Sequence, residues 1–344
     1  MPKAPPSNPA SLSVNRVRRI LAAASKTRIL VVGDVMLDQF IWGSVGRISP
    51  EAPVPIVDFV RESYMPGGAA NVARNLAALG SKCQLQSVVG KDRAAEQLHE
   101  LLSAQRIGCK GLFQHAQRHT SIKTRIVAHQ QQVVRVDRES KEELDAAATR
   151  GLIASVQREL TECDAVIVGD YGKGVVTQEL LDALRDLARK YGIWLSLDPK
   201  PVHRLDVSHL SLITPNRKEA FELAGLPDTT RHANPLQDRN LLLVSKNLLS
   251  ELQPALLLIT LGEQGMLLCR REHAPFHIPT VAQEVFDVSG AGDTVIASFT
   301  LAIAAGASPI EAAIFSNYAA GVVVGKVGTA TATPSELIAS LPKG

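Results

Sequence analysis

Strand-like and helix-like segments alternate along most of this 344-residue chain, and this alternation limits its possible folds more than any other feature. Residues 28–34 form a continuous apolar run that ends in Gly-Asp, as expected of a buried strand. In residues 68–79, small and apolar side chains recur at helical spacing, and Gly80 ends the helix. The same patterns predict strands at 84–89, 164–169, 193–198, 210–213 and 255–260, and helices at 92–104, 177–190, 216–224, 238–250, 291–304 and 309–324. We therefore expect an α/β fold whose mostly parallel central sheet has helices on both faces.

Two segments interrupt this alternation. Residues 39–62 are proline-rich and β-like, and residues 120–137 alternate polar and apolar side chains on both sides of a turn at 129–132. Because such segments do not easily join a parallel core, we expect a small separate β-sheet. This sheet would act as a lid over the site or as the contact of a homodimer. We expect one domain over 28–344, preceded by an N-terminal tail and short helix over 1–27.

The composition excludes several classes of protein. The 45% of hydrophobic residues suffices for a large core, and a net charge of +3 is far below that of a nucleic-acid-binding surface. No apolar run approaches the ~20 residues of a membrane span. The four cysteines lack metal-site spacing, as expected for thiols in the reducing cytoplasm. Residues 1–33 lack acidic side chains, as transit peptides do, but a frayed tail and a short amphipathic helix explain them more simply.

Small residues at 290–292 separate an extended-looking segment, 285–288, from a helical one. The first N–H groups of a helix lack partners, and the helix dipole favours an anion. Gly290, Ala291 and Gly292 would therefore suit a phosphoryl group in transfer. Asp293 would lie in the first helical turn, where it could accept a proton from an incoming hydroxyl. The alternative interpretation is that Asp293 only complements the helix dipole.

A second glycine-rich segment precedes the helix at 68–79. Gly67 and Gly68 would let the main chain approach a ligand, and the Asn71 amide could both donate to and accept from a sugar hydroxyl. The alternative is a flexible turn followed by a helix-start Asn. Further along the chain, Asn216 and Glu219 have the spacing of a capping box. The same two residues could lie near a triphosphate and order water around Mg²⁺.

Three aspartates close predicted strands at their carboxyl ends: Asp34, Asp170 and Asp198. Ligands of open α/β sheets bind outside these ends, so three such residues on one rim favour a site. Lys173 and Lys200 would add positive charge to this rim. The hairpin also carries basic side chains, which form either a solvated face or a grip for a phosphate already on the substrate. The candidates for that grip are Lys123, Arg125, Arg135 and Lys200.

Residues 67–80 and 287–299 resemble the two signatures of the ribokinase/PfkB carbohydrate kinase family, and the resemblance extends over about residues 28–334. Residues 214–219 and 256–262 also resemble the nucleotide side of that family. The resemblance implies a ribokinase-like fold with ATP and Mg²⁺ as cofactors. It implies that Asp293 is the base and that Gly290, Ala291 and Gly292 form the anion hole. Glu219 would bind Mg²⁺ through water. The residues expected on the ATP side are Asn216, Glu219, Thr260, Gly262 and Asn317.

Segments 33–38, 47–55, 170–174 and 198–200 resemble the bacterial D-glycero-D-manno-heptose 7-phosphate kinases. This resemblance implies phosphorylation at O1, to give the heptose 1,7-bisphosphate used for ADP-heptose and the lipopolysaccharide inner core. Many relatives carry a fused nucleotidyltransferase domain, for which this chain has no room, so we expect a stand-alone kinase. A monovalent cation is possible, by family analogy, near Asp287, Ser289 and Gly328. The residues expected to hold the sugar are Asp34, Asp38, Gly67, Gly68 and Asn71.

Three other functions stay open. A kinase of another sugar would carry the same two signatures. A sugar-binding regulator could keep the fold and lose the chemistry, although the intact Gly-Ala-Gly-Asp sequence argues against it. A dinucleotide oxidoreductase would need a third glycine where Val295 stands. Residues 321–327 are one residue short of a Walker phosphate loop.

Overall fold

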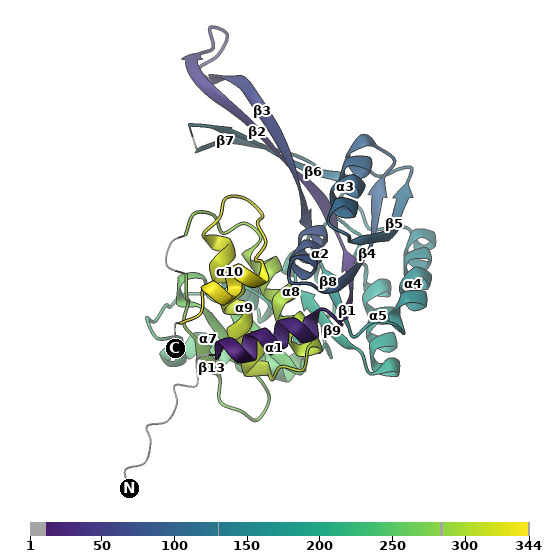
Figure 1. Ribbon diagram of the computed structural model, residues 1–344, viewed down its shortest axis with the longest axis vertical. Helices are drawn as coiled ribbons and strands as arrows, with labels where there is room; N and C mark the ends of the chain where they lie inside the picture. Colours follow the sequence, from purple (N-terminus) through teal and green to yellow (C-terminus); the bar gives the residue numbers. More distant parts are fainter. Residues whose placement is uncertain (1–11, 130, 283–284, 343–344) are drawn as a thin grey trace.

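The computed structural model describes residues 12–129, 131–282 and 285–342. Within them, nine strands form a central sheet in which all but two strand pairs are parallel, and this confirms the predicted fold class (Figure 1). The two antiparallel pairs lie at one edge. In spatial order the strands are β13 (Phe276–Ile278), β12 (Met266–Cys269), β11 (Leu256–Thr260), β10 (Leu212–Ile213), β9 (Trp194–Asp198), β8 (Ala165–Gly169), β1 (Arg28–Gly33), β4 (Lys82–Gly90) and β5 (Gly108–His115).

Helices cover both faces of this sheet. In β1, Ile29 and Val31 point into one apolar core, whereas Leu30 and Val32 point into the other, because successive strand residues face opposite sides. The first core packs against α1 (Val14–Ala24), α2 (Ala69–Ala78), α3 (Arg93–Ala104), α8 (Ala291–Ala304), α9 (Pro309–Val324) and α10 (Pro334–Ala339). The second core packs against α4 (Ala146–Leu160), α5 (Gln178–Tyr191), α6 (Arg217–Leu223) and α7 (Arg239–Glu251).

Strands β9, β8 and β1 are neighbours and run parallel, so their carboxyl ends meet at one edge of the sheet. Asp34 and Asp170 follow β1 and β8, and Asp198 ends β9. The three aspartates therefore lie on one rim, as the sequence predicts. The N-terminus of α8 also faces this rim, because a Cβ on Gly292 would lie 3.8 Å from Asp198 Oδ2.

The two segments that interrupt the alternation form a separate four-stranded sheet, as expected. Its order is β3 (Pro55–Gly68), β2 (Val35–Ile48), β6 (Ser121–Ala128) and β7 (Gln131–Arg138). Figure 1 shows it as an arm of long strands that projects from the body of the molecule. We call it the lid sheet. Its predicted turn at 129–132 includes residue 130, which is outside the described residues.

Other details differ from the sequence predictions. Helix α4 and strands β5, β12 and β13 have no counterpart among the predicted elements. Residues 285–288 were expected to be extended like a strand, but the structure assigns no strand there, so a loop leads into α8.

Helix α1 packs against the first core through Val17, Ile20 and Ala24. Among the helices of the described residues, none combines the length and apolar character that crossing a membrane requires.

Candidate active site

Asp293 lies in the first turn of α8, as predicted, and its carboxylate is enclosed by two neutral donors. The Tyr171 hydroxyl donates to Oδ1 at 2.5 Å, and Asn71 Nδ2 donates to Oδ2 at 2.7 Å. The residue is 8% exposed. Asn71 opens α2, so the two glycine-rich helix starts, 222 residues apart in the chain, meet at this carboxylate. Simple complementation of the helix dipole would not require two side chains to converge on Asp293.

Burial raises the pKa of Asp293 to about 6, because it disfavours the charged form. The hydrogen bonds from Tyr171 and Asn71 favour the carboxylate and oppose this rise, whereas the negative charge of Asp38 adds to it. Burial also raises the pKa of Tyr171 well above 10, so its hydroxyl stays a donor at neutral pH. Asp293 is therefore ionised near pH 7 and close enough to its pKa to take up a proton.

The loop before α8 carries the residues expected to form an anion hole. Gly290 has a φ of 78°, which a residue with a side chain rarely adopts, and a Cβ there would lie 2.6 Å from Asn71 Nδ2. The N–H groups of Gly290 and Gly292 make no hydrogen bond within the described part of the chain. Ala291 differs from the expectation, because its N–H donates to Val288 O at 3.2 Å. Two of the three expected donors are thus available to an anion.

The first glycine-rich segment serves the site through close packing. A Cβ on Gly67 would collide with the Asp38 carboxylate, and Gly68 has a φ of 61° beside the Asp34 carbonyl. Asn71 is fully buried, with its Oδ1 3.2 Å from Arg74 Nη1. This contact orients the Asn71 amide so that its NH₂ faces Asp293. The structure therefore places the Asn71 amide against the Asp293 carboxylate, and its contact with sugar hydroxyls stays a prediction.

Asp34 is also placed differently from the expectation. Its carboxylate is fully buried and accepts backbone N–H groups from Tyr171, Lys173 and Val175 at 2.8–3.0 Å. These hydrogen bonds show that Asp34 shapes the loop that carries Tyr171 and Lys173, and its contact with a sugar stays a prediction. Sequence reasoning missed the role of Tyr171, although its position just after a strand-closing aspartate is the signal that could have revealed it.

Asp170 is likewise turned inward. It is 4% exposed and lies 3.0 Å from His203 Nδ1. Burial, with the charge of Asp34, raises the pKa of Asp170 to about 6. Of the three rim aspartates, Asp198 alone lies beside the start of α8. Two of them therefore stabilise the rim from within, and a contact of Asp170 with substrate stays a prediction.

The carboxylates of Asp198 and Glu219 form an acidic cluster beside the N-terminus of α8. Burial, followed by the charges of Glu219 and Asp293, raises the pKa of Asp198 well above its usual range. Asn216 and Glu219 form the predicted capping box of α6. Lys200 Nζ lies 3.2 Å from Glu219 Oε1, so Lys200 lies with these groups and not with the basic side chains of the lid sheet. A role of Lys200 in a grip on the substrate phosphate stays a prediction.

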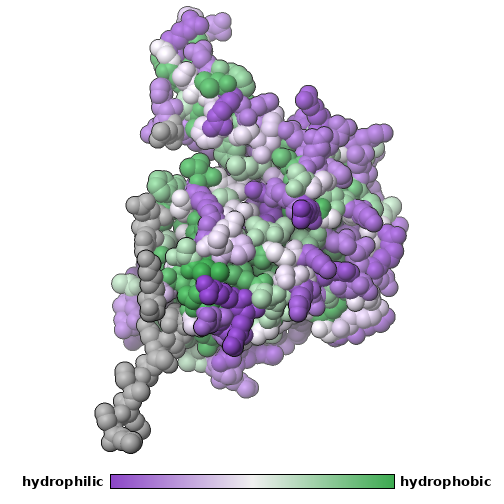
Figure 2. All heavy atoms as spheres, in the orientation of Figure 1, coloured by the Kyte–Doolittle hydropathy of each residue, from purple (hydrophilic) through white to green (hydrophobic). Residues whose placement is uncertain are grey.

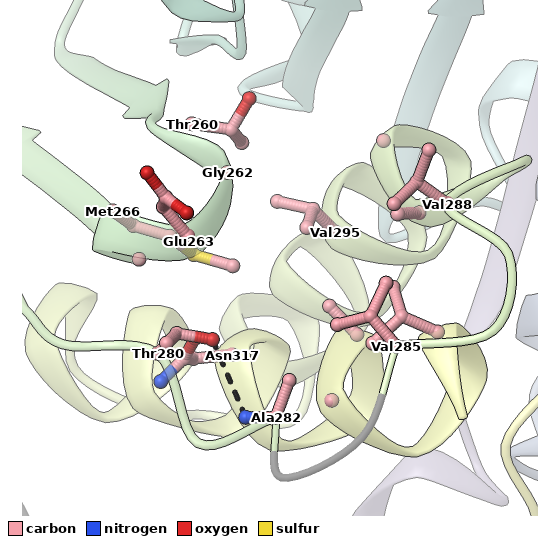
Figure 3. A pocket seen from close by; sticks show the side chains of 16 residues that line it. Thr260, Gly262, Glu263, Met266, Thr280, Ala282, Val285, Val288, Val295 and Asn317 are labelled. Carbon is pink, nitrogen blue, oxygen red and sulfur yellow. Dashed lines mark hydrogen bonds between the residues drawn. The ribbon is translucent and has the colours of Figure 1, made fainter.

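A cavity of about 470 Å³ opens beside Ala291 and Gly292 (Figure 3). Met266 and Val295 lie on opposite walls, and Val285 and Val288 add further apolar surface. Asn216 pairs with Thr260 through a β-bridge, which places the α6 cap next to the cavity. An apolar cavity that ends at free helix N–H groups suits a nucleotide with its phosphates at that end. Three residues predicted for the ATP side line this cavity: Thr260, Gly262 and Asn317.

The basic side chains of the lid sheet are not a simple solvated face. Arg125 pairs with Asp38 at 2.5 Å, and both side chains are largely buried. Arg135 pairs with Asp137 at 2.9 Å and is about half exposed. Lys123 is opposite Asp38 in the β2–β6 register, so both point to the same face of the sheet. Lys123 and Arg125 are therefore next to Asp38, on the side of the Gly67 segment.

The residues expected near a monovalent cation also lie together. Asp287 accepts the N–H groups of Ser289 at 2.9 Å and of Gly328 at 3.0 Å. Each Asp287 oxygen thus has an N–H partner, and a cation at this position stays a prediction. The described residues contain no group of three or more His, Cys, Asp or Glu side chains arranged for a metal ion.

Comparison with known proteins identifies relatives that match most of this chain. The profile of the pfkB family carbohydrate kinases matches residues 26–336. The bifunctional protein HldE of Citrifermentans bemidjiense is 42% identical over 328 residues, and that of Geobacter metallireducens is 41% identical over 325. These matches cover 95% and 94% of this chain but 66% and 65% of the relatives, so the chain spans less than two thirds of their length.

Solved structures show the same fold at low sequence identity. Arabidopsis thaliana ribokinase complexed with ribose and ATP has a TM-score of 0.71 at 17% identity, covering 92% of this chain and 99% of the ribokinase. Phosphofructokinase-2 from Escherichia coli, in complex with potassium, has a TM-score of 0.73 at 20% identity, covering 90% and 97%.

Proposed function

Because this chain belongs to the pfkB family of carbohydrate kinases, we propose that it transfers the γ-phosphoryl group of ATP to O1 of D-glycero-D-manno-heptose 7-phosphate. The observation that carries the chemistry is the buried Asp293 carboxylate at the start of α8, between the sugar side and the nucleotide cavity. The product would be heptose 1,7-bisphosphate, a precursor of ADP-heptose for the lipopolysaccharide inner core. A reaction that consumes ATP and supplies such a precursor fits the cytoplasm.

In this reaction Asp293 accepts the proton of the O1 hydroxyl as that oxygen attacks the γ-phosphorus. The new O1–P bond forms while the bond from the γ-phosphorus to the bridging oxygen of ADP breaks. Asn71 and Tyr171 hold the carboxylate in place and in its charged form. The N–H groups of Gly290 and Gly292, with the helix dipole, stabilise the charge on the transferred phosphoryl oxygens.

The residues of the nucleotide side fit ATP and Mg²⁺. The cavity has apolar walls for the adenine base, and it ends at the α8 N-terminus, where a phosphate is favoured. Burial and the nearby charge of Glu219 disfavour the charged form of Asp198, a cost that a divalent cation would relieve. These two residues would hold Mg²⁺, Glu219 through water, and the cation would neutralise charge on the phosphate oxygens.

The identity of the sugar rests on the four segments that resemble heptose 7-phosphate kinases and on the basic residues beside Asp38. Asp38 and Arg125 lie on the sugar side of Asp293, and Lys123 is adjacent in the register. A phosphorylated sugar would add a charge that these side chains can bind.

Steady-state assays of ATP turnover test this proposal with heptose 7-phosphate, fructose 6-phosphate, ribose and adenosine as acceptors. We expect the highest kcat/KM with heptose 7-phosphate and a phosphate on O1 of the product by ³¹P NMR. A preference for fructose 6-phosphate would identify a kinase of another sugar phosphate. A preference for ribose or adenosine would contradict the assignment to a phosphorylated substrate.

We also propose that two copies of the chain associate through their lid sheets. Strands β3 and β7 are the edges of this sheet, and its outer part exposes apolar side chains, which appear as green areas on the arm in Figure 2. Exposed apolar groups next to open strand edges favour pairing with another chain. The exposed apolar residues of the arm are Ile48, Val54, Phe59, Val60, Val133, Val134 and Val136.

Sedimentation equilibrium tests this association. We expect a dimer for the unaltered protein and a monomer for the double variant Phe59→Asp, Val134→Asp. Leu243→Asp is the matched control, because Leu243 is 48% exposed on α7, outside the lid sheet. A dimer that persists in the double variant, or a monomeric unaltered protein, would contradict association through the lid sheet.

A further inference from the structure

One buried carboxylate, that of Glu139, joins the lid sheet to the body of the molecule. Glu139 follows directly after β7, and its side chain is 7% exposed. Its Oε2 lies 2.6 Å from Nζ of Lys173, which belongs to the loop after β8. Its Oε1 lies 3.4 Å from Nζ of Lys123, on β6 of the lid sheet. A single acidic group thus holds two largely buried ammonium groups from separate parts of the fold, and Nζ of the exposed Lys141 lies 3.8 Å from its Oε2.

This arrangement is more than an ordinary surface ion pair. The side chains of Lys173 and Lys123 are 11% and 20% exposed, so both charges are largely removed from water. Burial by itself would raise the pKa of Glu139, but the hydrogen bond and charge of Lys173, with the charge of Lys123, bring it below its ordinary value. Oε1 makes no hydrogen bond within the described residues. Glu139, Lys123 and Lys173 are therefore held close together while one oxygen of Glu139 lacks a hydrogen bond.

The charges of the cluster leave a surplus of two positive charges. Four cations and two carboxylates are linked by contacts of 3.9 Å or less, and a phosphate monoester near pH 7 carries a charge of about −1.5 to −2. The cluster can therefore neutralise one phosphate. Its members are Lys123, Arg135, Lys141 and Lys173, with Asp137 and Glu139.

The position of the cluster matches the sugar side of the site. Lys173 is two residues beyond Tyr171, whose hydroxyl donates to the Asp293 carboxylate. Lys123 is opposite Asp38 on the inner face of the lid sheet. Lys123, Glu139 and Lys173 are not among the residues that line the nucleotide cavity. An anion bound here would be on the acceptor and not on ATP.

We propose that Glu139 is a positioning residue that holds Lys123 and Lys173 as the receptor for the phosphate already present on the sugar. This inference rests on the proposed kinase function and names the residues that would give it its preference for a phosphorylated acceptor. Without the shared carboxylate, the two ammonium groups repel each other and lose their common position. The receptor would then bind a phosphate less well, although Asp293 and the nucleotide cavity would be unchanged.

Glu139→Gln tests the proposal, because it keeps the shape and removes the charge. We expect the KM for heptose 7-phosphate to rise about 10-fold or more, as for the loss of a charged hydrogen-bond partner. The KM for ATP should change less than about twofold. Turnover of an acceptor without a phosphate, mannose, should also change less than twofold, which a general loss of structure would not permit. Glu143→Gln is the matched control, because Glu143 is exposed and takes part in none of the ion pairs that link the cluster.

A second variant keeps the test valid if Glu139→Gln does not fold. Lys123→Gln should raise the KM for heptose 7-phosphate in the same way, and the double variant should lose less than the product of the two single effects. An unchanged KM would overturn the proposal. A lowered KM would also overturn it, because Glu139 would then compete with the phosphate.

Inorganic phosphate separates failure of this inference from failure of the proposed function. It should inhibit the unaltered enzyme in competition with the sugar, and inhibit Glu139→Gln about 10-fold more weakly. Equal inhibition of both proteins would refute the role of Glu139. If heptose 7-phosphate were not a substrate but another sugar phosphate were, the same comparison with that acceptor would still decide the role of Glu139.

Discussion

Removal of the Tyr171 hydroxyl should change the pH at which the enzyme loses activity, and not its maximal rate. In Tyr171→Phe, Asp293 loses the hydrogen bond at Oδ1 and keeps only the one from Asn71. A hydrogen bond to a charged group contributes about 1.5–3 kcal/mol, and 1.36 kcal/mol corresponds to one pH unit. Because the lost bond favours the ionised carboxylate, the acid limb should move upward by about one to two pH units.

The size of the expected loss of activity at a given pH follows from the raised pKa of Asp293, which is about 6. Near pH 6 about half of the unaltered enzyme carries the ionised base, and activity falls as the pH decreases through this value. In the variant about 1–10% would be ionised at the same pH, so kcat/KM should fall by about 5- to 50-fold. Near pH 9 the base is ionised in both proteins, and the two activities should converge.

The appropriate assay is the pH dependence of kcat/KM between pH 5 and 9.5, because this parameter reports ionisation in the free enzyme. Tyr191→Phe is the control, since Tyr191 is 40% exposed at the end of α5. A loss of equal size at every pH would refute the reasoning, because Tyr171 would then act on the shape of the site. An unshifted profile would show that the Tyr171–Asp293 hydrogen bond has no influence on the base.

Three further variants test other parts of the site. Asp293→Asn should lower kcat about 10²- to 10⁴-fold while calorimetry shows unchanged ATP binding; retained turnover would exclude Asp293 as the base. Gly290→Ala should lose at least about 10-fold in kcat, because its Cβ would meet Asn71. Gly306→Ala, with a similar φ of 80° and nothing within 4 Å, should lose only about 1–2 kcal/mol of stability and keep its activity. Asp34→Asn should lower the free energy of unfolding by about 1–3 kcal/mol in urea titrations, because an amide cannot accept three N–H groups; unchanged stability would contradict its buried role.

Local patterns predicted most of the central sheet and its helices. The observed bounds of α8 and α9 equal the predicted ones, because apolar spacing and a terminating glycine are properties of adjacent residues. The capping box at Asn216 and Glu219 was predictable for the same reason. Helix α4 and strand β5 were missed, and the expected strand at 285–288 is a loop.

The partners of single side chains were not predictable in this way. Asp34, Asp170 and Asp198 follow three similar strands, yet one binds backbone N–H groups, one pairs with His203 and one lies beside Gly292. Lys200 lies near Asp198 in the chain and pairs with Glu219. Such contacts depend on loop conformations and on the order of the strands, which short sequence patterns do not specify.

The sequence alone determined that this chain forms a parallel α/β sheet, with two glycine-rich helix starts and a carboxylate in the first turn of one of them. Those features follow from hydrophobic period, helix capping and the conformational freedom of glycine, all of which are local. Only the tertiary structure decided that Asn71 and Tyr171 enclose Asp293 and that Glu139 joins Lys123 to Lys173. These contacts connect residues far apart in the chain, and sheet order, strand register and burial bring them together.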